Sequence, residues 1–421
     1  MRVLIYASEC NPDFSSEPAF IYHTCRSIVD MVDEAVVVTH IRNKEAIDAK
    51  GMGKAQVVYL DTEYIARPIM RISYSLKLGP ASGTAIQYPV QYAFEYALWK
   101  RFKLELQAGA FDVVHRVGPI SPALPSPLAS WSSVPFVIGP INGGLPYPPQ
   151  FSDVLRKEGE WLRYVRQGYR LLPYATSTFR NAAAILAAFE HTIEKLPPGH
   201  EDRIIDVPEI GASPDQLSWK ERPARKDRID FMFVGRLVPF KCVDVVISAF
   251  AASNELRKHR LLIVGDGPER PRLEQLVRDN GLADCVICCG WVPQAEVAQL
   301  MQDSDVFAFP SIRDSGAGVI AEAMMAGLAP IVVDYGPGRH LVTDKSGIRI
   351  PLGSRKDHIR DFQEAMERLA TDASLRLSLG KGARDRAVNR LSWPVKAQKI
   401  VDIYDWVIGS RPDKPGGLLW D

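Results

Sequence analysis

The sequence lacks an excess of charge of either sign. Its 421 residues carry 51 Lys and Arg against 50 Asp and Glu, which gives a formal net charge of +1. Proteins that bind nucleic acid present a strongly basic face, so this balance argues against a nucleic-acid partner. The composition, 46% hydrophobic and 24% charged, is that of an ordinary globular protein. The length predicts about two or three domains.

Long apolar runs are also missing. No run approaches the roughly 20 apolar residues that span a bilayer, and the longest charge-free stretch, 117–152, is interrupted by Pro and Gly. The apolar run before Glu9 is too short for a signal peptide. Six cysteines and the absence of any Asn-x-Ser/Thr sequon favour a reducing compartment. We therefore expect a cytoplasmic protein.

Metal-ligand spacing is absent as well. Cys285, Cys288 and Cys289 share an apolar, strand-like run, but no second Cys pair or His pair stands at zinc spacing. We expect buried thiols there. The motif Asp303-Ser-Asp305 is similar to a metal-binding Asp-x-Asp, yet it precedes a strand and so lies at the far end of the sheet. We expect neither a metal nor a bound cofactor.

What the chain does contain is a regular alternation of strand-like and helical patterns, which predicts parallel sheets. The strands predicted in the first half are 2–7, 35–39, 56–60, 111–115, 136–139 and 182–188, and the run 204–210 is expected to close the first domain. Those predicted in the second half are 229–235, 261–265, 286–290, 306–309 and the run before Asp334. The charged, proline-bearing stretch 213–230 between the two halves is typical of a linker.

The stretch 305–333 combines a strand, a glycine-bearing loop and a helix. The apolar run 306–309 ends at a proline, and the helix formers 319–325 follow the loop. Backbone N–H groups at the start of such a helix form an anion site. Here they belong to Gly316, Ala317, Gly318 and Val319.

Two acids lie within this stretch. Asp314 in the loop and Glu322 in the helix have seven residues between them. Carboxylates at the ligand edge of a sheet are good acceptors for a pair of vicinal hydroxyls. The alternative is a pair of solvated acids with no binding role.

A pair of cations follows the first strand of the second half. Arg236 and Lys241 flank a tight loop that leads into a helix, an arrangement that suits a diphosphate. The alternative is two solvated surface charges. The next strand ends in a turn at Gly267, which lacks the third glycine of a dinucleotide site. The loop 334–338 follows a further strand and is expected to line the same site.

The first half offers fewer candidates. Glu17 stands in the first turn of a helix that Ser16 is expected to cap, and it is a candidate contact for acceptor or diphosphate. His115 ends a strand and would face a cleft, or else be structural. The loop Gly143-Gly144 allows close approach of its backbone to a ligand.

Taken together, these motifs resemble the retaining glycosyltransferases of family 4, which have the GT-B fold. The resemblance is carried by Gly-Arg-Leu at 235–237, Lys241, Gly267-Pro268, and the acidic pair Asp314 and Glu322. This chain differs from the usual family pattern in having Asp314 in place of Glu, Cys242 in place of Gly and Ser15 in place of Gly. The resemblance covers nearly the whole chain and is strongest over 231–333.

The resemblance implies an α/β fold of two Rossmann-like domains that face each other across a cleft. We expect a Rossmann-like acceptor-binding domain over 1–210 and a nucleotide-sugar-binding domain over 211–394. A C-terminal helix, about 395–410, would cross back to the first domain. The Pro- and Gly-rich tail 411–421 is expected to be loose.

It also implies a metal-independent hexosyltransferase that uses a UDP- or GDP-linked sugar. The acceptor would be a sugar or a lipid-linked precursor of a bacterial polysaccharide. Glu322 would hold the ribose, Asp314 the donor sugar and Arg236 with Lys241 the diphosphate. His115 would position the sugar, and Val292 would border the nucleotide base. The alternatives are another GT-B enzyme, such as a sugar-nucleotide epimerase or an inverting transferase, and a non-catalytic nucleotide-sugar-binding subunit.

Basic and aromatic residues alternate at helical spacing over 64–108 and again over 154–180. Such stretches can rest on an anionic bilayer, which predicts peripheral contact with the inner face of the membrane. The alternative is helices with an apolar core face and a solvated basic face.

Overall fold

The structure is a computed structural model of the chain, and it describes all residues except 15, 76–79, 152–169, 216, 218–226 and 420–421. The chain divides into two compact units. The first unit comprises Met1–Gly144, Glu160–Glu209 and Trp393–Asp421, and the second comprises Leu145–Gly159 and Ile210–Ser392. Residues 145–151, predicted to lie in the first domain, belong to the second unit. Residues 154–169 of the predicted basic stretch 154–180, and residues 216 and 218–226 of the predicted linker 213–230, lie outside the described residues.

The first unit is built on a seven-stranded sheet with the order β3-β2-β1-β4-β5-β6-β7. Neighbouring strands all pair in parallel. The strands are β1 Arg2–Ala7, β2 Glu34–His40, β3 Gln56–Leu60, β4 Val113–Arg116, β5 Phe136–Ile138, β6 Ala182–Leu186 and β7 Ile204–Ile205. The chain order reverses between β1 and β4, which is where open α/β sheets bind ligands.

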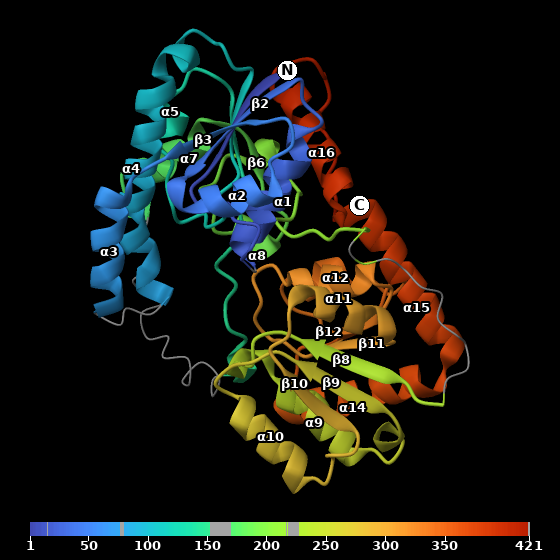
Figure 1. The fold of residues 1–421 in the computed structure, drawn as a ribbon. Coiled ribbons are helices and arrows are strands. Elements are labelled where there is room, and N and C mark those ends of the chain that lie inside the picture. The colour runs from blue at the N-terminus through green and yellow to red at the C-terminus, as the bar shows by residue number, and fades with distance from the viewer. Residues whose placement is uncertain (15, 76–79, 152–169, 216, 218–226, 420–421) are drawn as a thin grey trace. The chain divides into compact units, whose positions relative to one another are not determined.

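Helices cover both faces of this sheet. They are α1 Glu17–Val29, η1 Ile41–Asn43, α2 Lys44–Lys50, α3 Glu63–Ser75, α4 Pro80–Gln107, α5 Leu128–Trp131, α7 Ala175–Arg180, α8 Glu190–Ile193, η4 Glu201–Arg203 and α16 Trp393–Val407. Within this unit α16 packs against α1, although the two helices lie far apart in the sequence (Figure 1). The predicted return of the C-terminal helix to the first domain is therefore present.

The period-two alternation of β1 explains the two cores of the first unit. Val3 and Ile5 pack in one apolar cluster together with residues of α1 and α16. Leu4 and Tyr6 pack in the other, with residues of α4 and α5. Because successive side chains of a strand point to opposite faces, a fully apolar strand must be covered on both sides.

A buried carboxylate joins α4 to this sheet. Glu95 is fully buried and accepts hydrogen bonds from Ser126 Oγ at 2.7 Å, Leu128 N at 3.1 Å and Gln91 Nε2 at 3.0 Å. Tyr6 OH donates to Glu95 Oε1, the oxygen that also accepts from Gln91, at 3.2 Å. Burial raises the pKa of Glu95. This group therefore ties α4, β1 and the segment before α5 to one another.

The described part of the C-terminal tail, 411–419, is tied to the first unit, so the expectation of a loose tail is wrong for these residues. Leu418 and Leu419 are only 3% and 5% exposed. Their N–H groups donate to the backbone oxygen and to Oδ2 of Asp206, at 2.8 and 2.6 Å. Two adjacent leucines supply the apolar burial, and the Asp206 carboxylate satisfies the backbone that enters the core with them.

The second unit has a six-stranded parallel sheet with the order β10-β9-β8-β11-β12-β13. Its strands are β8 Asp230–Val234, β9 Arg260–Val264, β10 Val286–Gly290, β11 Val306–Phe309, β12 Ala329–Val333 and β13 Ile348–Ile350. β10 forms an edge of the sheet. For this reason Cys288 and Cys289 are half-buried rather than buried as expected, whereas Cys285 is buried.

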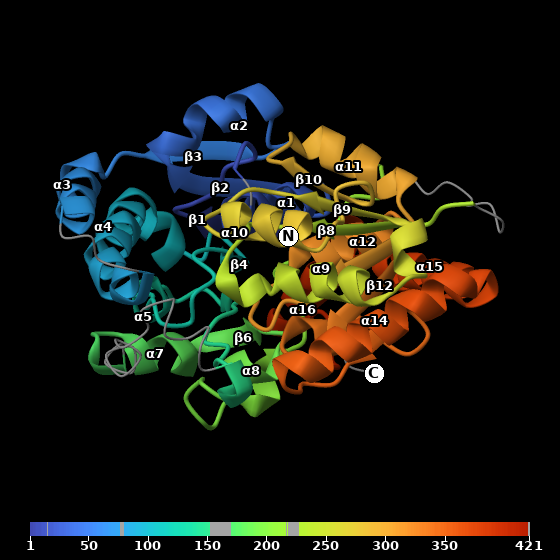
Figure 2. The ribbon, with the colours of Figure 1, turned by 90° about the horizontal axis from the view of Figure 1, so that it is seen from below.

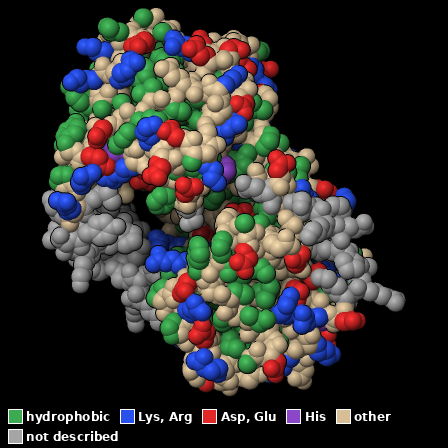
Figure 3. All heavy atoms as spheres, in the orientation of Figure 1, with side chains coloured by type: hydrophobic (Ala, Val, Ile, Leu, Met, Phe, Trp, Pro, Cys, Tyr) green, Lys and Arg blue, Asp and Glu red, His purple; other side chains and the backbone are tan. Residues whose placement is uncertain are grey.

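Helices flank the second sheet as well, and α9 and α14 lie side by side (Figure 2). The helical elements are η2 Pro149–Phe151, η5 Pro239–Lys241, α9 Val243–Ala252, η6 Leu256–Lys258, α10 Arg270–Asp279, α11 Gln294–Asp303, α12 Gly318–Met325, α13 Pro337–Leu341, α14 Arg355–Thr371, α15 Ala373–Arg386 and the π-helical turn η7 Ala387–Leu391. Among the described residues, none of the helices combines the length and the hydrophobicity needed to span a membrane. On the face shown in Figure 3, Lys and Arg side chains lie among Asp and Glu side chains.

Candidate active site

The predicted site residues of the second unit gather at one edge of its sheet. Arg236 follows β8, Gly267 follows β9, Val292 follows β10 and Asp314 follows β11. These four strands are parallel, so their carboxyl ends meet at the same edge, which is the usual ligand edge of such sheets. The structure thus brings together residues that lie far apart in the sequence.

Two turns that hydrogen-bond to each other hold the backbone next to Arg236. Leu237 N donates to Asp266 O at 2.9 Å, and Glu269 N donates to Leu237 O at 3.0 Å. A Cβ on Gly267 would lie 2.3 Å from Leu237 O, so only glycine fits where the turns touch. Gly267 therefore shapes the loop and leaves Arg236 exposed. Among the described residues, no hydrogen-bond or ion-pair partner holds the Arg236 guanidinium.

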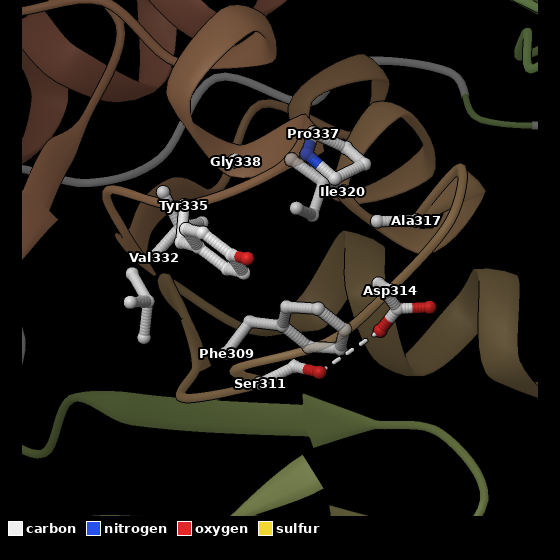
Figure 4. Close-up of a pocket in the computed structure, with 10 residues that line it drawn as sticks. Phe309, Ser311, Asp314, Ala317, Ile320, Val332, Tyr335, Pro337 and Gly338 are labelled. Carbon is white, nitrogen blue, oxygen red and sulfur yellow. Dashed lines mark hydrogen bonds between the residues drawn. The ribbon is translucent and has the colours of Figure 1, made fainter. Parts of the chain in front are cut away.

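Lys241 and Asp314 form an ion pair. Lys241 is only 8% exposed, and its Nζ lies 4.7 Å from the centre of the Phe309 ring. Asp314 Oδ2 also accepts a hydrogen bond from Ser311 Oγ at 3.0 Å, drawn dashed in Figure 4. Cys242, which follows Lys241, has a left-handed backbone with φ 49°, a conformation that favours glycine, the residue of the family pattern at this position. The predicted diphosphate cation thus already contacts the predicted sugar-binding acid.

The loop after Asp314 ends at the N-terminus of α12. Ala317 is the N-cap, and Gly318 is the first residue of the helix. Asp314, Ser311 and Ala317 line a small hollow of about 10 Å³ together with Phe309 and Tyr335 (Figure 4). That volume is about the space of one water molecule. The N–H groups predicted to bind an anion therefore lie beside the Lys241–Asp314 pair.

Ala317 adopts a left-handed backbone with φ 53°, which side chains with a Cβ disfavour. We expect Ala317→Gly to raise the free energy of unfolding of the second unit by about 1 kcal/mol. Ala321→Gly is the matched control: it lies inside the same helix, and glycine there should lower the unfolding free energy by about 1 kcal/mol. Urea denaturation of both variants measures the difference. A loss of stability in Ala317→Gly would contradict the strained cap.

Glu322 lies in the second turn of α12 and is half-buried. Its Oε2 accepts a long hydrogen bond, 3.5 Å, from Nε2 of Gln294, the first residue of α11. Burial raises the pKa of Glu322 to about 7. Val292 stands two residues before Gln294, so the corner predicted to border the base meets the acid predicted to hold the ribose. Gln294 itself was not predicted, since an amide at a helix start gives no distinctive pattern.

His115 does not occupy the position that the sequence predicts. It is fully buried, with Nδ1 2.5 Å from Tyr404 OH and Nε2 2.6 Å from Gly139 O. Burial lowers the pKa of His115 to about 4, so the ring is neutral near pH 7. The structure contradicts a cleft-facing His115 and supports the structural alternative, because strand alternation turns its side chain towards α16. With both ring nitrogens engaged, it has no group to offer a sugar, and we leave it out of the site.

Glu17 and the loop Gly143-Gly144 lie in the first unit and are joined through Ile120. Ile120 N donates to Glu17 Oε1 at 2.9 Å, and Ile120 O accepts from Asn142 N at 2.9 Å. Burial raises the pKa of Glu17 to about 7. The Ser16 side chain makes no capping bond, contrary to expectation.

The glycine loop packs against the protein itself. Gly143 N donates to Thr192 Oγ1 at 3.1 Å, and a Cβ on Gly144 would lie 2.7 Å from Lys195 Nζ. The close approach that the two glycines allow is therefore made to α8 and the residues after it. Contact of this loop with a ligand stays a prediction.

Comparison with known proteins defines the fold first. Sucrose-phosphate synthase from Thermosynechococcus elongatus matches with a TM-score of 0.69 and 16% identity, over 97% of this chain and 100% of that one. WaaG, a glycosyltransferase involved in lipopolysaccharide biosynthesis, matches with a TM-score of 0.59 and 15% identity, over 97% and 100%. With its two parallel α/β units, the chain has the GT-B fold, as predicted.

Sequence comparison adds a match to a protein family. Residues 215–386 match the model of the glycosyl transferases group 1. A D-inositol 3-phosphate glycosyltransferase of Stackebrandtia nassauensis is 28% identical over 255 residues, 57% of this chain and 55% of the relative. A GDP-mannose-dependent alpha-mannosyltransferase of Mycobacterium tuberculosis is 29% identical over 254 residues, 60% of each chain. The chain thus spans little more than half the length of these relatives. The resemblance inferred from the motifs is borne out.

Proposed function

We propose that the protein is a retaining glycosyltransferase that moves a sugar from a nucleotide-diphosphate sugar to a hydroxyl group of an acceptor. The observation that carries this is the cluster of Lys241, Asp314 and the N-terminus of α12 at the ligand edge of the family-matched unit. Arg236 adds an exposed cation at the same edge. Two cations beside a helix N-terminus suit a diphosphate, and an adjacent acid suits sugar hydroxyls.

The proposed chemistry follows from where charge develops. The bond between the sugar C1 and the diphosphate oxygen breaks, and negative charge grows on the departing phosphate. Arg236, Lys241 and the α12 amides would stabilise that charge. The acceptor oxygen attacks C1 from the same face, and its proton passes to the departing phosphate. Since the donor would draw Lys241 to its diphosphate, Asp314 would be released to the sugar.

Because protein cations would supply the positive charge, we propose that transfer needs no divalent metal. Turnover with excess EDTA should equal turnover without it. A loss of activity that Mg²⁺ or Mn²⁺ restores would contradict this part of the proposal.

We propose a UDP- or GDP-linked hexose as donor. One relative is named for its dependence on GDP-mannose, and a neighbour, Anabaena HepE, is described in complex with UDP and glucose. For the acceptor we propose a sugar or a lipid-linked precursor of a polysaccharide, bound by the first unit. A neighbour involved in lipopolysaccharide biosynthesis supports this class of acceptor.

Differential scanning fluorimetry with UDP-, GDP- and ADP-sugars tests the donor. A donor present at 100 times its Kd should stabilise the protein by about 2.7 kcal/mol, a shift of several degrees in Tm. Product analysis without acceptor then separates the alternatives. An epimerase would release a changed sugar nucleotide, whereas a transferase would leave the sugar unchanged or hydrolyse it slowly. If no sugar nucleotide shifts Tm, the proposal fails.

Donor affinity should depend on pH through Glu322. Its pKa of about 7 in the folded protein lies above the ordinary 4.5, so the proton is retained up to neutral pH. Ribose hydroxyls donate to the ionised carboxylate, so binding should strengthen as pH rises through 7, by about tenfold between pH 6 and 8. Calorimetry with UDP-glucose and GDP-mannose, whose diphosphates do not titrate in this range, measures the slope. Glu322→Gln should remove it. An equal slope in that variant would assign the titration to another group.

We also propose peripheral contact with the inner face of an anionic membrane. Arg67 and Arg71 of α3 are exposed, and with Tyr64, which is 68% exposed, they line a groove of about 380 Å³. Cations beside an exposed aromatic ring suit lipid headgroups. Flotation with vesicles rich in phosphatidylglycerol should retain the wild type and release a variant with Arg67→Glu and Arg71→Glu. Equal recovery of both would remove this proposal.

A further inference from the structure

A short segment that follows the first stretch of the first unit packs within the second unit. The first unit's opening stretch ends at Gly144, and Leu145 begins the second unit. We call the described residues 145–151 the hook. The hook contacts the loop that carries Asp314, which lies far from it in the sequence. None of the motifs found in the sequence predicts this contact.

The first contact of the hook is with Arg313, the residue before Asp314. Arg313 Nη1 donates to Tyr147 OH at 3.0 Å, and Nε donates to Leu145 O at 3.4 Å. The guanidinium also lies 4.2 Å from the centre of the Tyr147 ring. A planar cation held by two hydrogen bonds and a ring face has little rotational freedom. The hook therefore fixes the side chain that immediately precedes the predicted sugar-binding acid.

The second contact is with the loop after β12. Tyr335 OH donates to Pro146 O at 2.9 Å. Leu145 is 5% exposed, and a Cβ on Gly336 would lie 2.7 Å from Leu145 Cδ2 and 3.6 Å from Asp314 O. Gly336 has φ 55°, so its lack of a side chain serves both the turn and this packing. Leu145 thus presses on a glycine that borders the backbone of Asp314.

The far end of the hook is anchored in the core of the second unit. Phe151, in η2, is 1% exposed, and its ring centre lies 5.1 Å from that of His358 on α14. A buried aromatic residue holds a segment in place because removing it exposes a large apolar area. The hook is therefore a fixed element against which Arg313 and Tyr335 are positioned.

We propose that the hook is a positioning device for sugar transfer, and that Arg313 and Tyr147 are positioning residues that aim Asp314 at the donor sugar. This rests on the proposed function of the site. Arg236 and Lys241 lie in the segment between β8 and α9. None of the contacts of the hook described above involves that segment. Loosening the hook should therefore disturb the sugar and leave the nucleoside diphosphate in place. A misplacement of about 1 Å at a reacting centre costs on the order of 100-fold in rate.

The test compares Arg313→Ala, Tyr147→Ala and Tyr147→Phe with the wild type. UDP and GDP affinities are measured by calorimetry, and kcat and KM by nucleoside diphosphate release from UDP-glucose and GDP-mannose. We expect Arg313→Ala and Tyr147→Ala each to lower kcat by about 10- to 100-fold, with nucleoside diphosphate affinity and Tm nearly unchanged. Tyr147→Phe keeps the ring under the guanidinium and should lose only a few-fold. The double alanine variant should be no worse than Arg313→Ala, since both changes break one interaction.

Arg368→Ala, an exposed arginine of α14 in the same unit, is the control and should match the wild type. Unchanged kcat in the hook variants would overturn the proposal, as would a parallel loss of kcat, nucleotide affinity and Tm, which indicates a structural role alone. Wild-type protein that binds neither UDP nor GDP would overturn the proposed function, and the role of the hook with it. Normal wild-type turnover with unaffected variants would overturn the hook alone.

Discussion

Replacing Lys241 with alanine should lower kcat by more than about 100-fold, because deleting one group that stabilises developing charge typically costs that much. Lys241 is the nearly buried cation of the site and is paired with Asp314. Steady-state kinetics with the donor found by fluorimetry measures the loss. Because Arg236 and the α12 amides remain, nucleoside diphosphate should still bind, more weakly than to the wild type.

The control for this prediction is Lys258→Ala, a lysine of the same unit whose side chain is 66% exposed and pairs with Glu255. It should have wild-type kcat. If Lys241→Ala kept more than a tenth of the wild-type rate with Tm unchanged, Lys241 would be a structural partner of Asp314. The non-catalytic alternative would gain support from a different result, namely a wild type that itself transferred no sugar.

The second large effect is on stability. Glu95→Ala should lower the unfolding free energy of the first unit by about 3–5 kcal/mol, the usual cost of breaking a buried network that involves a charged group. The change removes the common acceptor of Ser126 Oγ, Leu128 N and Gln91 Nε2 inside the core. A loss of this size corresponds to a fall in Tm of roughly 10 °C. Scanning calorimetry measures it.

Glu105→Ala provides the comparison within the same helix. Its side chain is 37% exposed and forms an ion pair with Arg101 one turn away, so we expect a change of less than about 0.5 kcal/mol. Equal effects of the two substitutions would show that α4 tolerates the loss of a core carboxylate. The account of how α4 is tied to the sheet would then be wrong.

Most of the fold could be predicted because its strands are continuous apolar runs. The predicted bounds of β1, β3, β10 and β11 coincide with the observed ones, and α12 begins one residue before its predicted start. Parallel strands buried on both faces leave such a run, and their short connections carry the turn residues. The edge strands β7 and β13 were not predicted, since runs of two and three residues are too short to leave a recognisable pattern.

The individual residues of the candidate site could be predicted from the sequence, whereas the contacts between them could not. Turn glycines, cations and acids at strand ends are local signals, and the structure places them at one sheet edge. The ion pair of Lys241 with Asp314 joins residues 73 positions apart and has no local signature. The prediction of a cleft-facing His115 was wrong because the exposure of its side chain depends on which face of β4 the residue occupies. The hook was not predicted because neither Tyr147 nor Arg313 belongs to a local motif, and their interaction is visible only in the folded structure.

The central claim is that a nucleoside diphosphate binds at the carboxyl edge of the second sheet, held by Arg236, Lys241 and the N-terminus of α12. Titration calorimetry of UDP and GDP against the wild type and an Arg236→Ala, Lys241→Ala double variant tests it most directly. We predict that at least one of the two binds the wild type, and that the double variant binds it more than about 100-fold more weakly, since each charged hydrogen bond contributes about 1.5–3 kcal/mol. Equal affinity for both proteins, or no binding to the wild type, would contradict the account.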